Sequence, residues 1–176
     1  MGKVFTPYRL IGLGFAAFIA VIDQIVKWYV VGPLDLRNVR NIELLSFFDL
    51  TYTENRGISL GMLEATNMEM RWLLVGLTAV IALVVLIWMM REKYLGDILG
   101  LSMILGGAIG NIRDRYLLGY VVDYADLHIG TFRPFLIFNI ADAAITIGVV
   151  IILARSLFIG DKDDKTTGEN TVLAEN

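Results

Sequence analysis

Four long apolar stretches dominate the pattern of hydrophobic and polar positions along the chain. A helix rises about 1.5 Å per residue, so about 20 residues cross the roughly 30 Å hydrocarbon core of a bilayer. The stretch over residues 72–90 has no charged residue and therefore lacks the polar face of a soluble helix. We expect one four-helix transmembrane domain over residues 1–160 and a disordered acidic tail over residues 161–176. The four predicted helices cover residues 10–31, 72–90, 95–112 and 135–159.

Two connecting segments, residues 32–71 and 113–134, fall on the same side of the predicted bundle. In the first, residues 50–53 alternate like a strand, and residues 54–57 are typical of a turn that leads residues 58–62 back beside it. The pattern predicts a small antiparallel sheet on the membrane surface. For the second segment we expect a short helix or a loop.

Composition excludes several classes of function. Hydrophobic residues make up 56% of the chain, above the roughly 45–50% of a soluble domain. With 15 basic and 18 acidic residues, the chain has no basic surplus for nucleic-acid phosphates, so we expect no nucleic-acid partner. The absence of cysteine and the single histidine, His128, exclude disulfides, zinc–thiolate sites and histidine-rich metal sites. We therefore expect neither metal nor cofactor. Basic residues are spread over both sides, so the positive-inside rule gives almost no orientation.

A small set of polar residues interrupts the apolar stretches. An ionisable side chain near the bilayer centre costs about 2.5–3.5 kcal/mol, so each one calls for an explanation. Asp142 lies seven residues inside the fourth stretch, and Asn139 is expected on the same helix face three residues earlier. Asn111 and Asp114 repeat this spacing at the end of the third stretch, and Asp123 follows in the next connection. These helix ends lie on one side of the bundle, so the groups can converge.

The residues themselves leave several interpretations open. Asp23 and Lys27, four residues apart on the first helix, favour a structural ion pair, and the glycines of the third stretch favour close helix packing. For Asp123 and Asp142, packing and chemistry are equally reasonable. Two aspartates held close share one proton, so one can activate water while the other protonates a carbonyl, as an aspartic peptidase requires. The alternative chemistry is a small proton-coupled transporter, since intramembrane acids also form proton relays. The polar groups gather at one membrane face, which favours the peptidase.

Five motifs follow one another along the chain: DQIVK at residues 23–27, NRG at 55–57, GGAIGNIRDR at 106–115, VVDY at 121–124 and FNIAD at 138–142. In this order and spacing, they resemble the motifs of lipoprotein signal peptidase (signal peptidase II), the bacterial intramembrane aspartic peptidase. Three residues or segments depart from the family pattern, namely residues 58–60, Arg113 and Asp126.

The resemblance implies a substrate, a location and roles for individual residues. It implies hydrolysis of the peptide bond before the diacylglyceryl-modified cysteine of a prolipoprotein, in the bacterial inner membrane. Both termini would be cytoplasmic and the active site would lie near the outer leaflet. Membrane lipids and cyclic-peptide inhibitors of the globomycin type are the other implied partners. Asp123 and Asp142 would be catalytic; Asn55, Gly57, Asn111, Arg115, Asn139 and Ala141 would shape the site; Asp23, Lys27 and Asp114 would support it.

Overall fold

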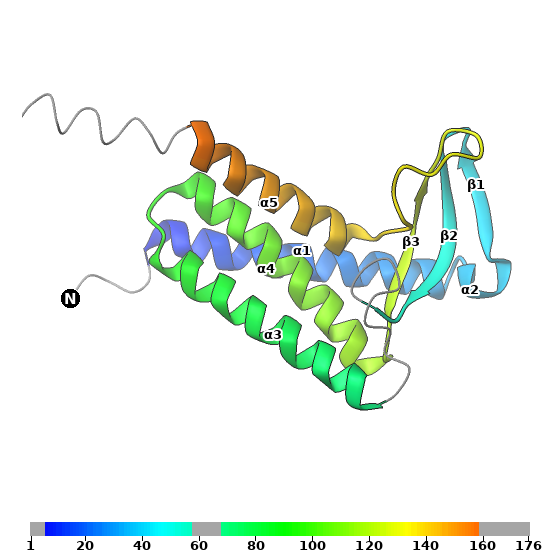
Figure 1. Cartoon of the computed structure of the whole chain (residues 1–176), viewed down its shortest axis with the longest axis horizontal. Coiled ribbons are helices and arrows are strands. Elements are labelled where there is room, and N and C mark those ends of the chain that lie inside the picture. The colour runs from blue at the N-terminus through cyan, green and yellow to red at the C-terminus, as the bar shows by residue number, and fades with distance from the viewer. Residues whose placement is uncertain (1–5, 58–67, 159–176) are drawn as a thin grey trace, which may run out of the picture.

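Four long helices form most of the computed structural model, which describes residues 6–57 and 68–158 (Figure 1). All four are long and apolar enough to cross a membrane. The predicted fold class, four membrane-spanning helices with a small antiparallel sheet, is confirmed. The predicted tail over residues 161–176 lies outside the described residues. The helices are α1 (Pro7–Val31), α3 (Met68–Arg91), α4 (Leu95–Leu117) and α5 (Ile140–Phe158).

Helix α4 is the centre of the bundle and packs against α1, α3 and α5. Its glycines make this close packing possible. A Cβ atom added at Gly106 would lie 2.5 Å from the carbonyl oxygen of Ala16 on α1, and one added at Gly107 would collide with the backbone of Ala141 on α5. Small residues let the backbones of neighbouring membrane helices approach closely. The glycines of α4 therefore have the packing function predicted for them.

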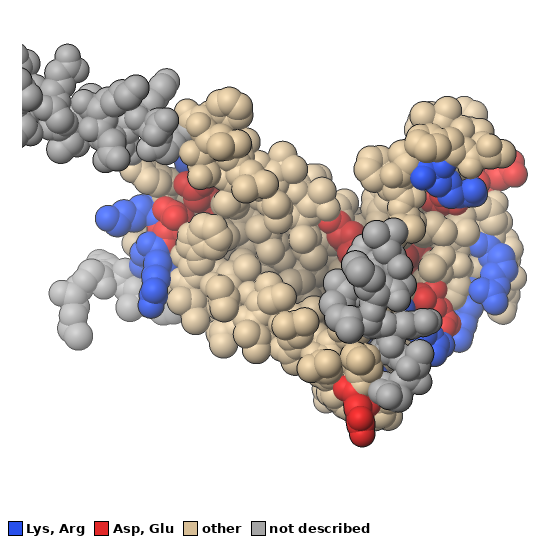
Figure 2. Space-filling model, in the orientation of Figure 1, with Lys and Arg blue, Asp and Glu red and all other residues tan. Residues whose placement is uncertain are grey.

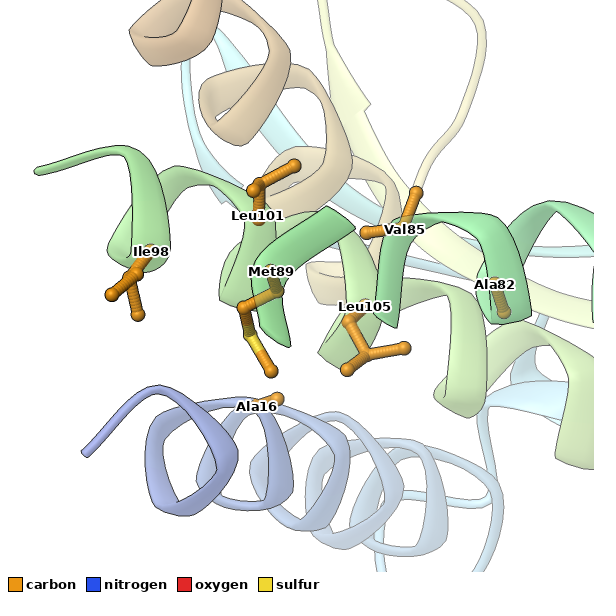
Figure 3. Packing of buried hydrophobic residues seen from close by; sticks show 7 residues of the cluster. All are labelled: Ala16, Ala82, Val85, Met89, Ile98, Leu101 and Leu105. Carbon is orange, nitrogen blue, oxygen red and sulfur yellow. The ribbon is translucent and has the colours of Figure 1, made fainter. Parts of the chain in front are cut away.

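An apolar cluster joins α1, α3 and α4 (Figure 3). Helix α3 is apolar on all sides and buries only a few side chains, as expected of a helix that faces lipid. On the face drawn in Figure 2, charged side chains gather at the two ends of the molecule, with an uncharged band between them. This band has the polarity of a membrane-spanning surface. The cluster consists of Ala16, Ala82, Val85, Met89, Ile98, Leu101 and Leu105.

A three-stranded antiparallel sheet lies across one end of the bundle, which we call the sheet end (Figure 1). Its order is β1 (Asn41–Leu45), β2 (Phe48–Asn55), β3 (Val121–Leu127), and a short helix α2 (Leu36–Val39) precedes it. Buried apolar residues of the sheet pack against α2 and the last turn of α1. The cluster consists of Tyr52, Val122, Tyr124 and Ala125 of the sheet, Leu36 of α2 and Val30 of α1.

The sheet differs from the predicted one in its strand partners. The predicted turn at residues 54–57 was wrong in its first half, because Glu54 and Asn55 belong to β2 and pair with Val122 and Val121. The proposed returning strand over residues 58–62 lies outside the described residues. β1, not predicted, pairs with β2 through a short turn in which Leu45 opposes Phe48.

The second connection is also different, since it contains strand β3 and not the expected short helix or loop. Nearly all of β3 is buried on both faces, so its sequence does not alternate between apolar and polar residues. Helix α5 begins at Ile140, five residues later than predicted. Phe138 forms a bridge with Ala125 of β3, which holds the preceding backbone extended. The apolar run from residue 135 to residue 138 therefore belongs to the loop beside the sheet.

Candidate active site

Asn139 and Asp142 form the start of helix α5. The side-chain oxygen of Asn139 accepts a hydrogen bond from the backbone N–H of Asp142 at 2.9 Å. The carboxylate of Asp142 accepts one in return from the backbone N–H of Asn139 at 3.2 Å. This reciprocal pair is a capping box, which satisfies free N–H groups at a helix start. The expectation that Asp142 lies seven residues inside the helix was wrong; the two residues meet through this cap, and Asp142 lies in the first turn.

Asp123 approaches this helix start from the sheet. It lies on β3, opposite Thr53 of β2, and is 1% exposed. The Asn139 amide donates to the Asp123 carboxylate at 2.6 Å and also lies 3.2 Å from the side-chain oxygen of Asn111. The Asn111 amide donates to Asp142 at 2.8 Å. Two asparagines thus link the two aspartates, as the convergence of the helix ends predicts.

The surroundings of Asp123 favour its protonated form. The pKa of the Asp123 carboxyl is raised to about 7, mainly by burial and further by the negative charge of Asp142. Hydrogen bonds from the side chains of Asn55 and Asn139 oppose it. Near neutral pH, the pair of aspartates can therefore hold a single proton, which is the condition for acid and base to coexist in one site.

A buried ionic network lies directly beside the aspartates. The Lys27 ammonium is 2.9 Å from a carboxylate oxygen of Asp23, 2.9 Å from one of Asp114 and 3.1 Å from the side-chain oxygen of Asn111. Asp23 accepts a hydrogen bond from the backbone N–H of Ala141 at 3.1 Å, next to Asp142. The ion pair expected between Asp23 and Lys27 is present, but it belongs to a larger network that joins α1, α4 and α5.

Gln24 belongs to this network and was missed in the sequence. Its amide nitrogen donates to Asp114 at 2.9 Å and to the backbone oxygen of Gly110 at 3.1 Å. Asp114 in turn accepts from the backbone N–H of Val122 on β3 at 3.3 Å. In the sequence, the one sign of this role was that Gln24 is a polar residue beside Asp23 in an apolar helix.

Arg115 links the end of α4 to the end of β2. It is buried and donates to the backbone oxygen of Gly57 at 2.8 Å. The N–H of Gly57 in turn bonds to the side chain of Asn55 at 3.1 Å, which forms an Asx turn. The structure therefore brings together every site residue that the resemblance implies, at the junction of the sheet with α1, α4 and α5.

A groove of about 800 Å³ runs from this junction along α5. Asn55 and Asp142 supply polar groups at one part of its wall, and most of the remainder is apolar. Such a groove can hold a largely apolar ligand with a few polar atoms directed at the carboxylate. Its other lining residues are Leu127, Pro134, Phe135, Leu136, Phe138, Ala143, Ile145, Thr146 and Ile147.

Two of the residues that depart from the family pattern, Asp126 and Arg113, make no printed contact with Asp123 or Asp142 in the described part of the chain. Asp126 is buried and accepts hydrogen bonds from Arg133 at 3.1 Å. Arg113 is exposed on α4 and bonds to the side chain of Gln24. The segment over residues 58–60 lies outside the described residues.

Comparison with known proteins identifies the family. The family described as Signal peptidase (SPase) II matches residues 15–158, which is most of the chain. The chain belongs to the signal peptidase II family. It is accordingly a peptidase, as the resemblance of its motifs implied, and nothing in the comparisons supports a transporter.

Relatives within the signal peptidase II family are similar over nearly their whole length. The lipoprotein signal peptidase of Sphingopyxis alaskensis is 51% identical over 172 residues, which cover 98% of this chain and 99% of the relative. That of Rhizorhabdus wittichii is 50% identical over 163 residues, covering 93% and 94%. A bacterial membrane enzyme solved by the in meso method at 2.3 Å resolution has a TM-score of 0.74 at 27% identity, over 86% of this chain and 90% of that one.

Proposed function

We propose that this protein removes the signal peptide from prolipoproteins, with Asp123 and Asp142 as its catalytic pair. The bond hydrolysed is the peptide bond on the N-terminal side of the diacylglyceryl-modified cysteine. The observation that carries the proposal is the link between the two carboxylates: Asn139 bonds to both of them, and Asn111 bonds to Asp142. The names of the relatives support the same substrate class.

The two aspartates differ in environment, and the difference suggests their roles. Asp123 is buried and has the raised pKa, so it carries the shared proton and protonates the carbonyl oxygen of the scissile bond. Asp142 lines the groove and, as the base of the pair, takes a proton from the attacking water. Asn111 and Asn139 hold both carboxyl groups in place, and Arg115 fixes the backbone at Gly57 beside them.

The groove suits a substrate that arrives within the bilayer. A signal helix and diacylglyceryl chains partition into lipid, so a membrane enzyme meets them by lateral diffusion. The apolar wall formed by α5 and the loop over residues 134–138 can take up acyl chains, while Asn55 and Asp142 face the peptide. Bilayer lipids and cyclic peptides of the globomycin type are expected to occupy the same groove.

A cleavage assay with the purified protein tests the substrate class. Incubation in detergent with a diacylglyceryl-modified prolipoprotein should release the signal peptide, and a globomycin-type cyclic peptide should block the release. The matched control is the same prolipoprotein without its lipid. Equal cleavage of both forms, or cleavage of neither, would contradict the proposed substrate.

The proposed roles predict how the reaction depends on pH. Asp123 must be protonated, so kcat/KM should fall as the pH rises through about 7 and the proton leaves the pair. At much lower pH both carboxyls are protonated, no base remains and the rate should fall again. A profile measured in mixed micelles, with protein integrity followed by thermal melting at each pH, checks this. A rate that stays constant up to pH 9 would contradict the assignment.

We assign both termini to the cytoplasm and the sheet end to the outer leaflet of the inner membrane. The chain has no cysteine, so single cysteines report the orientation without interference. Ser46, in the exposed turn of the sheet, and Lys93, exposed between α3 and α4, lie at opposite ends of the bundle. A membrane-impermeant maleimide should label Ser46→Cys in intact spheroplasts but label Lys93→Cys only after lysis. The reverse pattern would overturn the orientation.

A further inference from the structure

A second groove, of about 480 Å³, lies between α1 and α4. It shares no lining residue with the groove at the aspartate pair, and α3 and α5 supply none of its described lining. Helices α1 and α4 both run toward the sheet end, so later residues in both walls lie nearer the membrane surface (Figure 1). The lining residues are Ala20, Val21, Gln24, Ile25, Trp28, Ile109, Gly110 and Arg113.

The polarity of this second groove changes along its length. Its deeper part is formed by small and aliphatic side chains such as Ala20, Val21 and Ile109. Trp28 and Arg113 lie close to the ends of their helices, three residues before Val31 and four before Leu117, or about 4.5 Å and about 6 Å from the respective ends. Tryptophan and basic residues prefer this depth, where the headgroups of the lipids lie. The groove is thus apolar toward the bilayer core and cationic toward the surface, as an amphiphilic ligand requires.

Arg113 has no acidic partner in the described part of the chain. Its guanidinium bonds to the side-chain oxygen of Gln24, a neutral group. Gln24 is itself held in place, since its amide nitrogen bonds to Gly110 and Asp114. An exposed guanidinium at the lipid-facing surface of the bundle is stabilised by an anion at the same depth. Because the guanidinium fork matches phosphate oxygens, a lipid phosphate is the anion that best fits this position.

We propose that the groove between α1 and α4 binds one anionic phospholipid of the surrounding bilayer. The phosphate lies on Arg113, beside the fixed side chain of Gln24. One acyl chain follows Ala20, Val21 and Ile109 toward the bilayer core, and Trp28 covers the lipid at the level of its glycerol. This site is separate from the catalytic groove and does not depend on the aspartate mechanism.

Fluorescence quenching tests this proposal, because Trp28 is 68% exposed and lines the groove. A variant with Trp72→Phe and Trp88→Phe keeps Trp28 as its single tryptophan. In phosphatidylcholine vesicles, brominated phosphatidylglycerol should quench Trp28 at a mole fraction about fivefold to tenfold lower than brominated phosphatidylcholine does. Equal quenching by the two lipids would overturn the proposal. A second copy of the chain in the groove would shield Trp28 from both lipids and would overturn it too.

A charge variant and its control distinguish a site from general attraction. Arg113→Gln should abolish the preference for phosphatidylglycerol, whereas Arg40→Gln, at an exposed arginine of the same side, should leave it unchanged. Equal loss in both variants would mean a diffuse charge effect and would contradict the site. Native mass spectrometry of the unmodified protein, with both lipids in competition, gives a readout that needs no variant. In the mass spectrum, the lipid that stays bound to the protein should be phosphatidylglycerol. If phosphatidylglycerol and phosphatidylcholine stayed bound in the ratio in which they were supplied, the result would contradict the site.

Discussion

Asp123→Asn and Asp142→Asn should each reduce cleavage of a lipidated prolipoprotein by at least about 10³-fold while leaving a folded membrane protein. Asparagine keeps the shape of aspartate and still offers an oxygen to the neighbouring amides, so the links through Asn139 and Asn111 can persist. What is lost is the exchangeable proton of the pair: one variant removes the acid, the other the base. Steady-state cleavage rates, together with the elution volume and melting temperature of each variant, measure the two effects separately.

Two further variants make this prediction specific. Asp126→Asn removes another buried acid from the same strand, but one that bonds to Arg133 and does not line the groove, and should retain most of the activity. The double variant Asp123→Asn with Asp142→Asn should be no slower than either single variant, because groups that act as one unit are not additive. An Asp142→Asn protein that cleaves within tenfold of the unmodified rate, or a multiplicative loss in the double variant, would remove the shared-proton mechanism.

The helices could be predicted well because the bilayer imposes a length on every apolar segment. The start of α5 could not, because residues 135–138 continue the apolar run without a break. A bridge from Phe138 to Ala125 holds the backbone before the helix extended, and the cap formed by Asn139 starts the helix. These are tertiary and local features, which hydropathy does not reveal. β3 was missed for a related reason: a strand buried on both faces does not alternate, so it cannot be distinguished from a buried loop.

The composition of the site was easier to predict than its connections. Unpaired polar residues in apolar helices are costly, and this cost alone singled out Asp142, Asn111 and the pair Asp23 and Lys27. The spacing of residues within one helix could not reveal that Lys27 also reaches Asp114 on α4, or that Asp23 bonds to the backbone of α5. Such contacts depend on how the helices pack, which the glycines of α4 permit but do not specify.

Lys27→Met should be the most destabilising single change in this network. Lys27 is 4% exposed and is the ammonium group that lies between the carboxylates of Asp23 and Asp114. Methionine has a similar volume, so packing is largely kept, but two buried carboxylates then lose their counter-ion. Breaking a buried ion pair on one side costs about 3–5 kcal/mol, so the melting temperature in detergent should fall sharply and the yield of folded protein should drop. Cleavage by the remaining folded protein should also decrease, because Lys27 and Asp142 both bond to Asn111.

The matched comparison lies at the other end of the bundle, where Arg155 pairs with Asp97 at 2.8 Å but both side chains are more than a fifth exposed. Arg155→Met should lower the melting temperature much less, because water can solvate the carboxylate that is left.

Exchanging the partners, Asp23→Lys with Lys27→Asp, should fail to rescue the fold. The new aspartate would face Asp114, and the new lysine could not accept the hydrogen bond from the backbone N–H of Ala141. If the exchanged protein instead kept full stability, Asp23 and Lys27 would act as an isolated ion pair. The connection from Lys27 through Asp23 to the first turn of α5 would then have no role in positioning Asp142.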